Sequence, residues 1–242
     1  MREALPENIP IHIHHGENNK AFAGAIAQAT PNVHLTNMAV ENLTINEYSN
    51  YMTRASVYEG LPRGHTIVFQ TDSGMCDPKN PSHMKRLDDF VQKYDYVGSP
   101  WPWWTTGEVG GNGGISLRNV ETMARLAHDI EARATRRHPE DVVLSRLCSS
   151  DAACRMPTVF EAVKWNNQHK GFDAKDVNSE IRVIDGARCM VPREDPIAFH
   201  KVENICHRAA SCPGRSLIPH DGGANILSPE EVQAEIALLP SM

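Results

Sequence analysis

The chain has 242 residues, of which 40% are hydrophobic and 22% are charged, and its formal net charge is -6. A chain of this length buries enough surface to fold without a disulfide scaffold or a structural metal. The negative charge argues against a nucleic-acid partner, because a phosphate backbone attracts positive surface. No run reaches the roughly 18–20 apolar residues that a membrane span requires, so no membrane span is expected.

From the N-terminus onward, segments with strand periodicity alternate with segments that have helix periodicity. Strands are expected over residues 9–14, 33–38, 65–70, 94–97 and 181–184. Helices are expected over residues 21–27, 87–91, 141–148 and 159–165, after the capping box of Thr44 and Glu47, and from about residue 119 onward. This alternation predicts an α/β fold with a largely parallel sheet covered on both faces. We expect one domain over residues 1–212 and a loop-rich tail over residues 213–242.

The six cysteines form no Cys-x-x-Cys pair and are too sparse for a disulfide framework. Cys206, His207 and Cys212 do not have the spacing of a standard structural zinc site. The N-terminal residues lack the apolar core of a signal peptide. The sequence therefore predicts reduced thiols in a cytoplasmic protein.

Asp72 is the first candidate for a functional residue. It follows residues 65–70, whose β-branched and aromatic side chains predict a buried strand. Open α/β sheets bind ligands just beyond the carboxyl ends of their strands. The oxygens of Asp72 and Ser73 are hard ligands that suit Mg²⁺ or Mn²⁺ and a diphosphate. Asp72 is equally well interpreted as a turn residue, since Asp and Ser both favour turns.

Glu140 and Asp141 form a second candidate site. They follow Pro139 and precede an apolar run, as the first turn of a helix does. The helix dipole stabilises acidic residues there, which is a sufficient structural reason for both. The functional interpretation is that one of them is a general base held on a rigid element.

Three further features have both a structural and a functional interpretation. The glycines around Asn112 permit close approach to a ligand, although a flexible hairpin explains them equally well. Trp101, Trp103 and Trp104 have the type of side chain that stacks on a sugar, but such rings more often fill a core. His200 becomes a metal ligand only if a carboxylate lies beside it, because a lone histidine is usually structural.

The order of several segments resembles a family of glycosyltransferase-like proteins that are mostly described as a domain of unknown function. The resemblance covers about residues 9–204. It rests on four motifs and two outer segments: Phe69-Gln70-Thr71-Asp72-Ser73, Tyr94-Asp95-Tyr96-Val97-Gly98-Ser99-Pro100-Trp101, Gly111-Asn112-Gly113-Gly114-Ile115-Ser116-Leu117-Arg118, Glu140-Asp141-Val142, His15-Gly16-Glu17-Asn18 and Phe199-His200-Lys201.

That family is similar to the GT-A class of nucleotide-sugar glycosyltransferases. The resemblance implies a Rossmann-type sandwich around a central mixed, mostly parallel sheet flanked by helices. It also implies a divalent cation, Mn²⁺ or Mg²⁺, held on the nucleotide diphosphate by Asp72, within Thr71-Asp72-Ser73, and by His200. The matching position of the general base is Asp141, with Glu140 as the less favoured alternative. Gly111, Asn112, Gly113 and Gly114 are expected to line the sugar and acceptor cleft, with Trp101 nearby.

Two departures from the family pattern bear on function. The cation motif contains one acid, Asp72, where the class has two. Only eight residues precede the segment that matches residues 9–16, whereas relatives begin with a further strand and helix there. That first strand helps to hold the nucleotide base in the family. Its absence indicates a truncated gene, a misplaced start or a protein with a weakened nucleotide site.

The predicted function is transfer of a sugar from a nucleotide-diphosphate sugar to a glycan or other hydroxyl acceptor, with inversion at the anomeric carbon. The second hypothesis is a non-catalytic module of the same fold that binds a nucleotide-sugar or glycan. A metal-dependent phosphoester hydrolase is the third, and too few acids and histidines surround Asp72 in the sequence to favour it.

Overall fold

The computed structural model describes residues 6–76, 81–101, 111–133, 138–165, 179–184, 187–192 and 196–200. These residues belong to two compact units, of which the first contains residues 1–47 and the second residues 48–220. The predicted tail, residues 213–242, lies outside the described residues. The C-terminal part of the predicted domain, residues 201–212, lies outside them as well. The predicted domain boundaries therefore stay a prediction.

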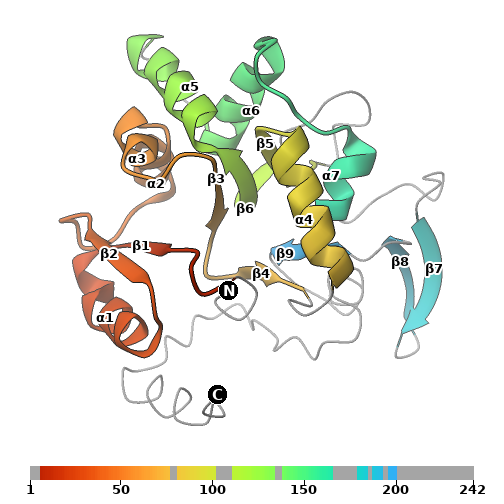
Figure 1. Cartoon of the computed structure of the whole chain (residues 1–242), viewed down its shortest axis with the longest axis horizontal. Coiled ribbons are helices and arrows are strands. Elements are labelled where there is room, and N and C mark those ends of the chain that lie inside the picture. The colour runs from red at the N-terminus through yellow and green to blue at the C-terminus, as the bar shows by residue number, and fades with distance from the viewer. Residues whose placement is uncertain are drawn as a thin grey trace. The chain divides into compact units, whose positions relative to one another are not determined.

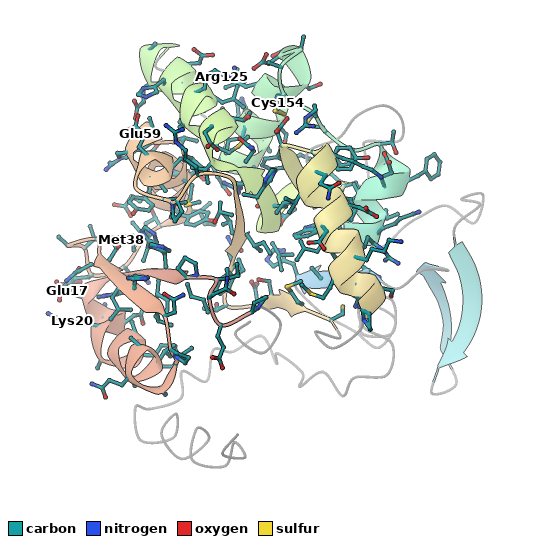
Figure 2. The ribbon with its side chains drawn as sticks, viewed as in Figure 1. Glu17, Lys20, Met38, Glu59, Arg125 and Cys154 are labelled. Atoms are coloured by element: carbon teal, nitrogen blue, oxygen red, sulfur yellow. A yellow bond between two sulfur atoms is a disulfide. The ribbon has the colours of Figure 1, made fainter. Side chains whose placement is uncertain are left out.

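The first unit contains a β-α-β arrangement (Figure 1). Strands β1 (Ile11–His15) and β2 (Val33–Asn37) pair in parallel, with Ile11 opposite Val33. The chain passes between them through a 3-10 turn, η2 (Glu17–Asn19), and helix α1 (Lys20–Ala29). Figure 2 shows Glu17 and Lys20 at the start of this connection. The two strands and the helix predicted for this region are confirmed.

The main sheet of the second unit has three strands in the order β3 (His65–Phe69), β6 (Asn112–Asn119) and β5 (Tyr96–Ser99). Strand β6 is antiparallel to both neighbours, so β3 and β5 run in the same direction with β6 between them. Helix α4 (Pro81–Lys93) lies in the chain between β3 and β5 (Figure 1).

The prediction of a mostly parallel sheet is wrong for the strands that the structure describes, where only β1 and β2 pair in parallel. A parallel pair needs a crossover of a dozen or more residues, which is usually helical, whereas an antiparallel strand does not. No helix separates β5 from β6 among the described residues, and β6 returns beside β5. The fold is mixed α/β with small parallel and antiparallel sheets.

Helices pack around this sheet and form the core of the second unit. They are α2 (Ile45–Met52), α3 (Ala55–Glu59), α5 (Val120–Arg133), α6 (Glu140–Ser150) and α7 (Val159–Trp165). Helix α5 contacts both α3 and α6 (Figure 1). Its predicted apolar face is confirmed, since Val120, Met123, Ala127 and Ile130 are all at most 4% exposed. Among the described residues, no helix is long and apolar enough to cross a membrane.

The capping box at the start of α2 is confirmed in atomic detail. The backbone N–H and the hydroxyl of Thr44 donate to a carboxylate oxygen of Glu47, at 2.8 and 2.7 Å. In return, the Glu47 N–H donates to the Thr44 hydroxyl at 3.3 Å. These bonds satisfy N–H groups that have no partner within the helix.

Two short antiparallel pairs complete the described strands. Strand β4 (Ser73–Met75) pairs with β9 (Ala198–His200), and β7 (Ser179–Ile184) pairs with β8 (Ala187–Pro192). The predicted strand over residues 65–70 forms as β3, but the expectation that it is buried is wrong. None of its five residues is fully buried, and Phe69 is 37% exposed. Among the described strands, β3 pairs only with β6 and forms an edge of the sheet.

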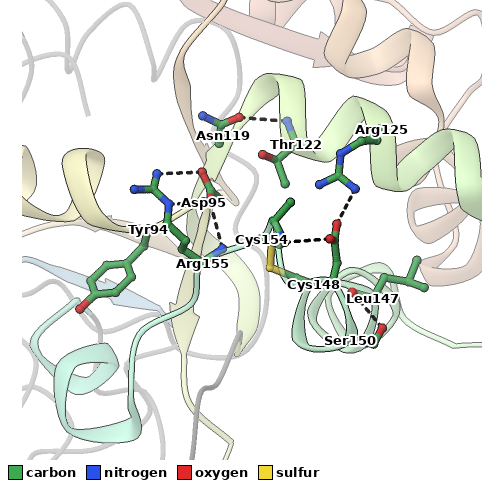
Figure 3. The surroundings of a disulfide bond; sticks show 12 residues. Tyr94, Asp95, Asn119, Thr122, Arg125, Leu147, Cys148, Ser150, Cys154 and Arg155 are labelled. Atoms are coloured by element: carbon green, nitrogen blue, oxygen red, sulfur yellow. Dashed lines mark hydrogen bonds and ion pairs between the residues drawn. A yellow bond between two sulfur atoms is a disulfide. The ribbon is translucent and has the colours of Figure 1, made fainter.

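Cys148 and Cys154 form a disulfide at the end of α6 (Figure 3). Cys76 is also disulfide-bonded. The prediction of reduced thiols is therefore wrong. The sequence did not reveal this pair because the turn after α6, where the Cys154 N–H donates to the Asp151 carbonyl, brings the two Cα atoms to 5.1 Å. Since disulfides persist in oxidising compartments, the cytoplasmic location stays a prediction without support from the cysteines.

The segment beyond the disulfide is anchored to the central sheet (Figure 3). Arg155 donates from its Nε and from one terminal nitrogen to the two carboxylate oxygens of Asp95, at 3.0 and 3.1 Å. The Arg155 backbone N–H adds a third bond to Asp95 at 2.9 Å. Asp95 directly precedes β5, so this fork joins the end of α6 to the strand that leads toward the candidate site.

Candidate functional site

A tight turn joins β3 to β4 and presents Asp72. The Ser73 N–H and the Ser73 hydroxyl both donate to the Gln70 carbonyl, at 3.1 and 2.7 Å. Thr71 and Asp72 are the two central residues of this turn. The Gln70 N–H donates to the Gly114 carbonyl at 2.8 Å, which ties the turn to β6. Asp72 therefore lies just beyond the end of β3, as predicted.

His200 lies beside Asp72 because β9 pairs with β4, with His200 opposite Ser73. The distance between His200 Nε2 and Asp72 Oδ1 is 3.1 Å. The Gln70 side-chain oxygen is also 3.1 Å from His200 Nε2. The imidazole is buried, whereas the Asp72 side chain is 30% exposed. The structure thus brings together the two residues that were predicted to share a cation.

Two consecutive glycines of β6 separate this group from a second one. A Cβ atom on Gly114 would lie 2.1 Å from Cε1 and 2.2 Å from Nε2 of His200. A Cβ atom on Gly113 would lie 2.7 Å from a terminal nitrogen of Arg118 and 2.7 Å from Glu140 Oε1. No other residue fits at either position without displacing these side chains. Gly113 and Gly114 were expected to line a cleft. In the structure, their lack of a side chain leaves room for the protein's own side chains.

The second group is centred on Arg118, whose side chain is fully buried. Its Nε donates to the Ser116 hydroxyl at 2.9 Å, and one terminal nitrogen donates to the Tyr58 hydroxyl at 2.8 Å. The other terminal nitrogen is 3.5 Å from Glu140 Oε1. The guanidinium also lies 5.4 Å from the centre of the Tyr96 ring. Burial alone would lower the pKa of Arg118, but these tyrosines and Glu140 hold it well above its usual value.

Glu140 and Asp141 begin α6, as predicted, and both are buried. Burial raises the pKa of Glu140, and the nearby Asp141 raises it further, although Arg118 opposes both effects. The Asp141 Oδ2 atom accepts the Gly113 N–H at 3.0 Å, and Oδ1 accepts the Val142 N–H at 2.8 Å. The Asp141 side chain therefore links Gly113 of β6 to the N-terminus of α6.

Residues 112–114 of the glycine-rich segment are part of strand β6, whereas Gly110 lies outside the described residues. Gly111 has a positive φ of 95°, and a Cβ atom there would lie 2.2 Å from the Ser99 carbonyl oxygen. Asn112 accepts the Gly114 N–H through its side-chain oxygen at 2.8 Å. Trp101 is only 6% exposed, which favours a core position for this ring. Trp103 and Trp104 lie outside the described residues.

The donor set around Asp72 fits a hard divalent cation. Two ligands at right angles, each about 2.1 Å from an ion, are about 3.0 Å apart, and His200 Nε2 lies 3.1 Å from Asp72 Oδ1. Among the described residues, no group of three or more His, Cys, Asp or Glu side chains converges on one point. Mg²⁺ in phosphate sites is nevertheless held by one or two carboxylates together with the substrate's phosphates and water.

The sequence analysis missed three residues of this region as site components. Gln70 and Arg118 were named only as parts of motifs, and Tyr48 was not named. A signal existed for Arg118, because it is a charge at the end of the otherwise uncharged strand segment Ile115-Ser116-Leu117. No comparable signal marked Tyr48. Burial and its neighbours Glu140, Arg118 and Gln70 bring the pKa of its phenol to about 12.

Comparison with known proteins identifies one family. A family model described as "Protein of unknown function (DUF5672)" matches residues 32–179, which is more than half of the chain. The matched region includes Asp72, the glycine segment, Arg118 and the Glu140-Asp141 pair. No curated protein and no solved structure is similar enough to the chain to count as a match.

Proposed function

The chain belongs to the DUF5672 family of proteins of unknown function, and we propose that it transfers a sugar from a nucleotide-diphosphate sugar to a hydroxyl acceptor. The observation that carries this proposal is the distance of 3.1 Å between Asp72 and His200 just beyond the end of β3. The proposal includes a relationship of the fold to the GT-A class, in which a carboxylate and a histidine hold the cation of the donor.

The partly exposed Asp72 would bind Mn²⁺ or Mg²⁺ together with His200, and the donor's diphosphate oxygens would complete the coordination. The cation supplies Lewis-acid stabilisation of the charge that grows on the leaving diphosphate. Thr71 and Ser73 flank Asp72 in the turn, which holds the carboxylate at a set position relative to His200.

Asp141 is the proposed general base, with Glu140 as the less favoured alternative. The acceptor hydroxyl attacks the anomeric carbon while Asp141 takes its proton, and the bond from that carbon to the diphosphate breaks. Direct displacement inverts the configuration at the anomeric carbon. A positioned base of this kind contributes about 10²–10⁴-fold to the rate. Asp141 accepts the Gly113 N–H. The next residue in the chain is Gly114, which lies against the His200 ring.

A non-catalytic binding module is the second candidate function. It is favoured by the burial of the proposed base, since Asp141 is 7% exposed and both of its carboxylate oxygens accept backbone N–H groups. On this hypothesis, the chain binds a nucleotide-sugar without forming a product, and Asp141→Asn changes only stability.

The first experiment measures the thermal stability of the full chain with UDP, GDP and their sugars, each with and without Mn²⁺. A ligand at about 100 times its Kd stabilises a protein by about 2.7 kcal/mol, which is a few degrees for a domain of this size. We expect a nucleotide shift that requires Mn²⁺ and is lost in Asp72→Ala. Asp88→Ala is the matched control, because Asp88 is an exposed acid on α4.

Turnover then separates the two candidate functions. Release of nucleoside diphosphate in the presence of an acceptor, abolished in Asp141→Asn, supports transfer. A Mn²⁺-dependent shift without product supports the binding module. A product that retains the donor's anomeric configuration contradicts direct displacement. The absence of any nucleotide shift contradicts transfer and favours the binding module, with a glycan as its ligand.

A further inference from the structure

We propose that the side-chain oxygen of Gln70 is a third donor of the cation site formed by Asp72 and His200. This deepens the proposed function by completing its cation site, and it rests on that site alone and not on sugar transfer.

Two oxygen atoms, one from Asp72 and one from Gln70, lie at hydrogen-bond distance from one imidazole nitrogen of His200. His200 Nε2 is 3.1 Å from Asp72 Oδ1 and 3.1 Å from Gln70 Oε1. A carboxylate oxygen and an amide oxygen only accept hydrogen bonds, and one imidazole nitrogen carries a single proton or a lone pair. One shared proton serves two acceptors poorly, whereas a cation attracts all three atoms. Both distances are close to the spacing of about 3.0 Å between ligands at right angles around Mg²⁺.

The backbone holds Gln70 in place for this role. Its N–H donates to the Gly114 carbonyl at 2.8 Å, and its own carbonyl accepts two bonds from Ser73, at 3.1 and 2.7 Å. Gly114 in turn leaves the space that the His200 ring occupies. The Gln70 side chain therefore extends from a fixed position toward a fixed imidazole. An amide carbonyl is a hard oxygen ligand of the kind that Mg²⁺ and Mn²⁺ accept.

Titration of the full chain with Mn²⁺ alone, followed by the electron paramagnetic resonance signal of the free ion, tests this proposal. Gln70→Ala is expected to raise the Kd of Mn²⁺ by about 10–100-fold, the size of effect seen when supporting groups of metal sites are removed. Gln70→Glu retains an oxygen donor and adds charge, so its Kd is expected to equal or fall below that of the unchanged chain.

Gln92→Ala is the matched control, because Gln92 is an exposed glutamine on α4 and the substitution is expected to leave the Kd unchanged. A Gln70→Ala variant that binds Mn²⁺ within twofold of the unchanged chain overturns the proposal. A Gln70→Glu variant as weak as Gln70→Ala also overturns it, because Gln70 would then act through its N–H₂ group. If Gln70→Ala does not fold, as judged by its melting curve, Gln70→Glu decides the outcome.

This test is separable from that of the proposed function. If the unchanged chain binds no Mn²⁺, the proposal that Gln70 is a third donor is overturned, whatever the nucleotide measurements show. Mn²⁺ binding that depends on Gln70, without any nucleotide shift, supports the three-donor site and contradicts sugar transfer.

Discussion

The two polar groups on either side of the Gly113–Gly114 step differ in how their charges are compensated. Around Arg118, donors and acceptors are matched, since its nitrogens contact Ser116, Tyr58 and Glu140 inside the protein. Around His200, two oxygen acceptors share one imidazole nitrogen, and the Asp72 side chain is 30% exposed. The first group has the properties of a structural support, whereas the second has those of a site that receives a cation.

The comparison also shows why adjacent glycines are needed. The absence of a side chain at Gly113 leaves room for the Arg118–Glu140 pair, and its absence at Gly114 leaves room for the His200 ring. A single short piece of β6 thus sets the position of both groups. Variants on each side are therefore expected to separate stability from ligand binding.

The largest expected effect comes from Arg118→Met. Removing one partner of a buried ion pair leaves the other charge uncompensated, which destabilises proteins by about 3–5 kcal/mol. Chemical denaturation measures the free energy of unfolding. Arg125→Met is the control, because Arg125 pairs with Asp151 at the surface with its side chain 47% exposed, and such pairs contribute about 0–1 kcal/mol. Equal losses in the two variants contradict a supporting role for Arg118.

Gly114→Ala is expected to cause the next largest loss of stability. The added methyl group must displace the buried His200 ring, and overpacking of this kind costs about 1–3 kcal/mol. Mn²⁺ binding is expected to be lost at the same time, because the imidazole moves away from Asp72. Gly24→Ala is the control, since nothing lies within 4 Å of the added atom on α1, and alanine is favoured over glycine there by about 0.5–1 kcal/mol. Retained Mn²⁺ binding in Gly114→Ala contradicts the assigned site.

Glu140→Gln is expected to change how stability depends on pH. Burial raises the folded-state pKa of Glu140 above its unfolded value, so the folded state binds more protons between the two. Stability then falls as the pH rises from about 4.3, the unfolded value, through the raised folded pKa. Glu140→Gln is expected to remove this decline, as measured by denaturation between acidic and neutral pH.

Glu47→Gln provides a control of opposite sign. The Thr44 capping bonds lower the pKa of Glu47, so its contribution is present above the unfolded pKa and is lost as the pH falls through the folded pKa. An unchanged pH profile in Glu140→Gln contradicts the burial of a charge-sensitive carboxyl at that position.

Asp72→Asn is expected to have the smallest effect on stability. Partly exposed turn residues usually change the free energy of unfolding by no more than about 0.5 kcal/mol when substituted. The same variant is expected to lose the stabilisation that Mn²⁺ provides, because an amide oxygen carries no charge. A large loss of stability without any ligand shows that Asp72 is mainly a structural turn residue.

Local sequence patterns predicted the parts of this fold that depend on neighbouring residues. The Thr44–Glu47 capping box and the apolar face of α5 are set by spacings of three and four residues, and both formed as expected. The acidic start of α6 also formed as expected. The position of Asp72 after β3 follows from the same local rule, because a polar turn ends an apolar strand.

Contacts between distant segments decided the rest. The direction of β6, the Cys148–Cys154 disulfide and the burial of Arg118 depend on how the chain returns, which no spacing in the sequence specifies. The sequence by itself determined that this chain has an acidic turn, a glycine segment and a distant histidine. Only the pairing of β4 with β9 decided that Asp72, Gln70 and His200 meet, because hydrogen bonding between remote strands sets that register.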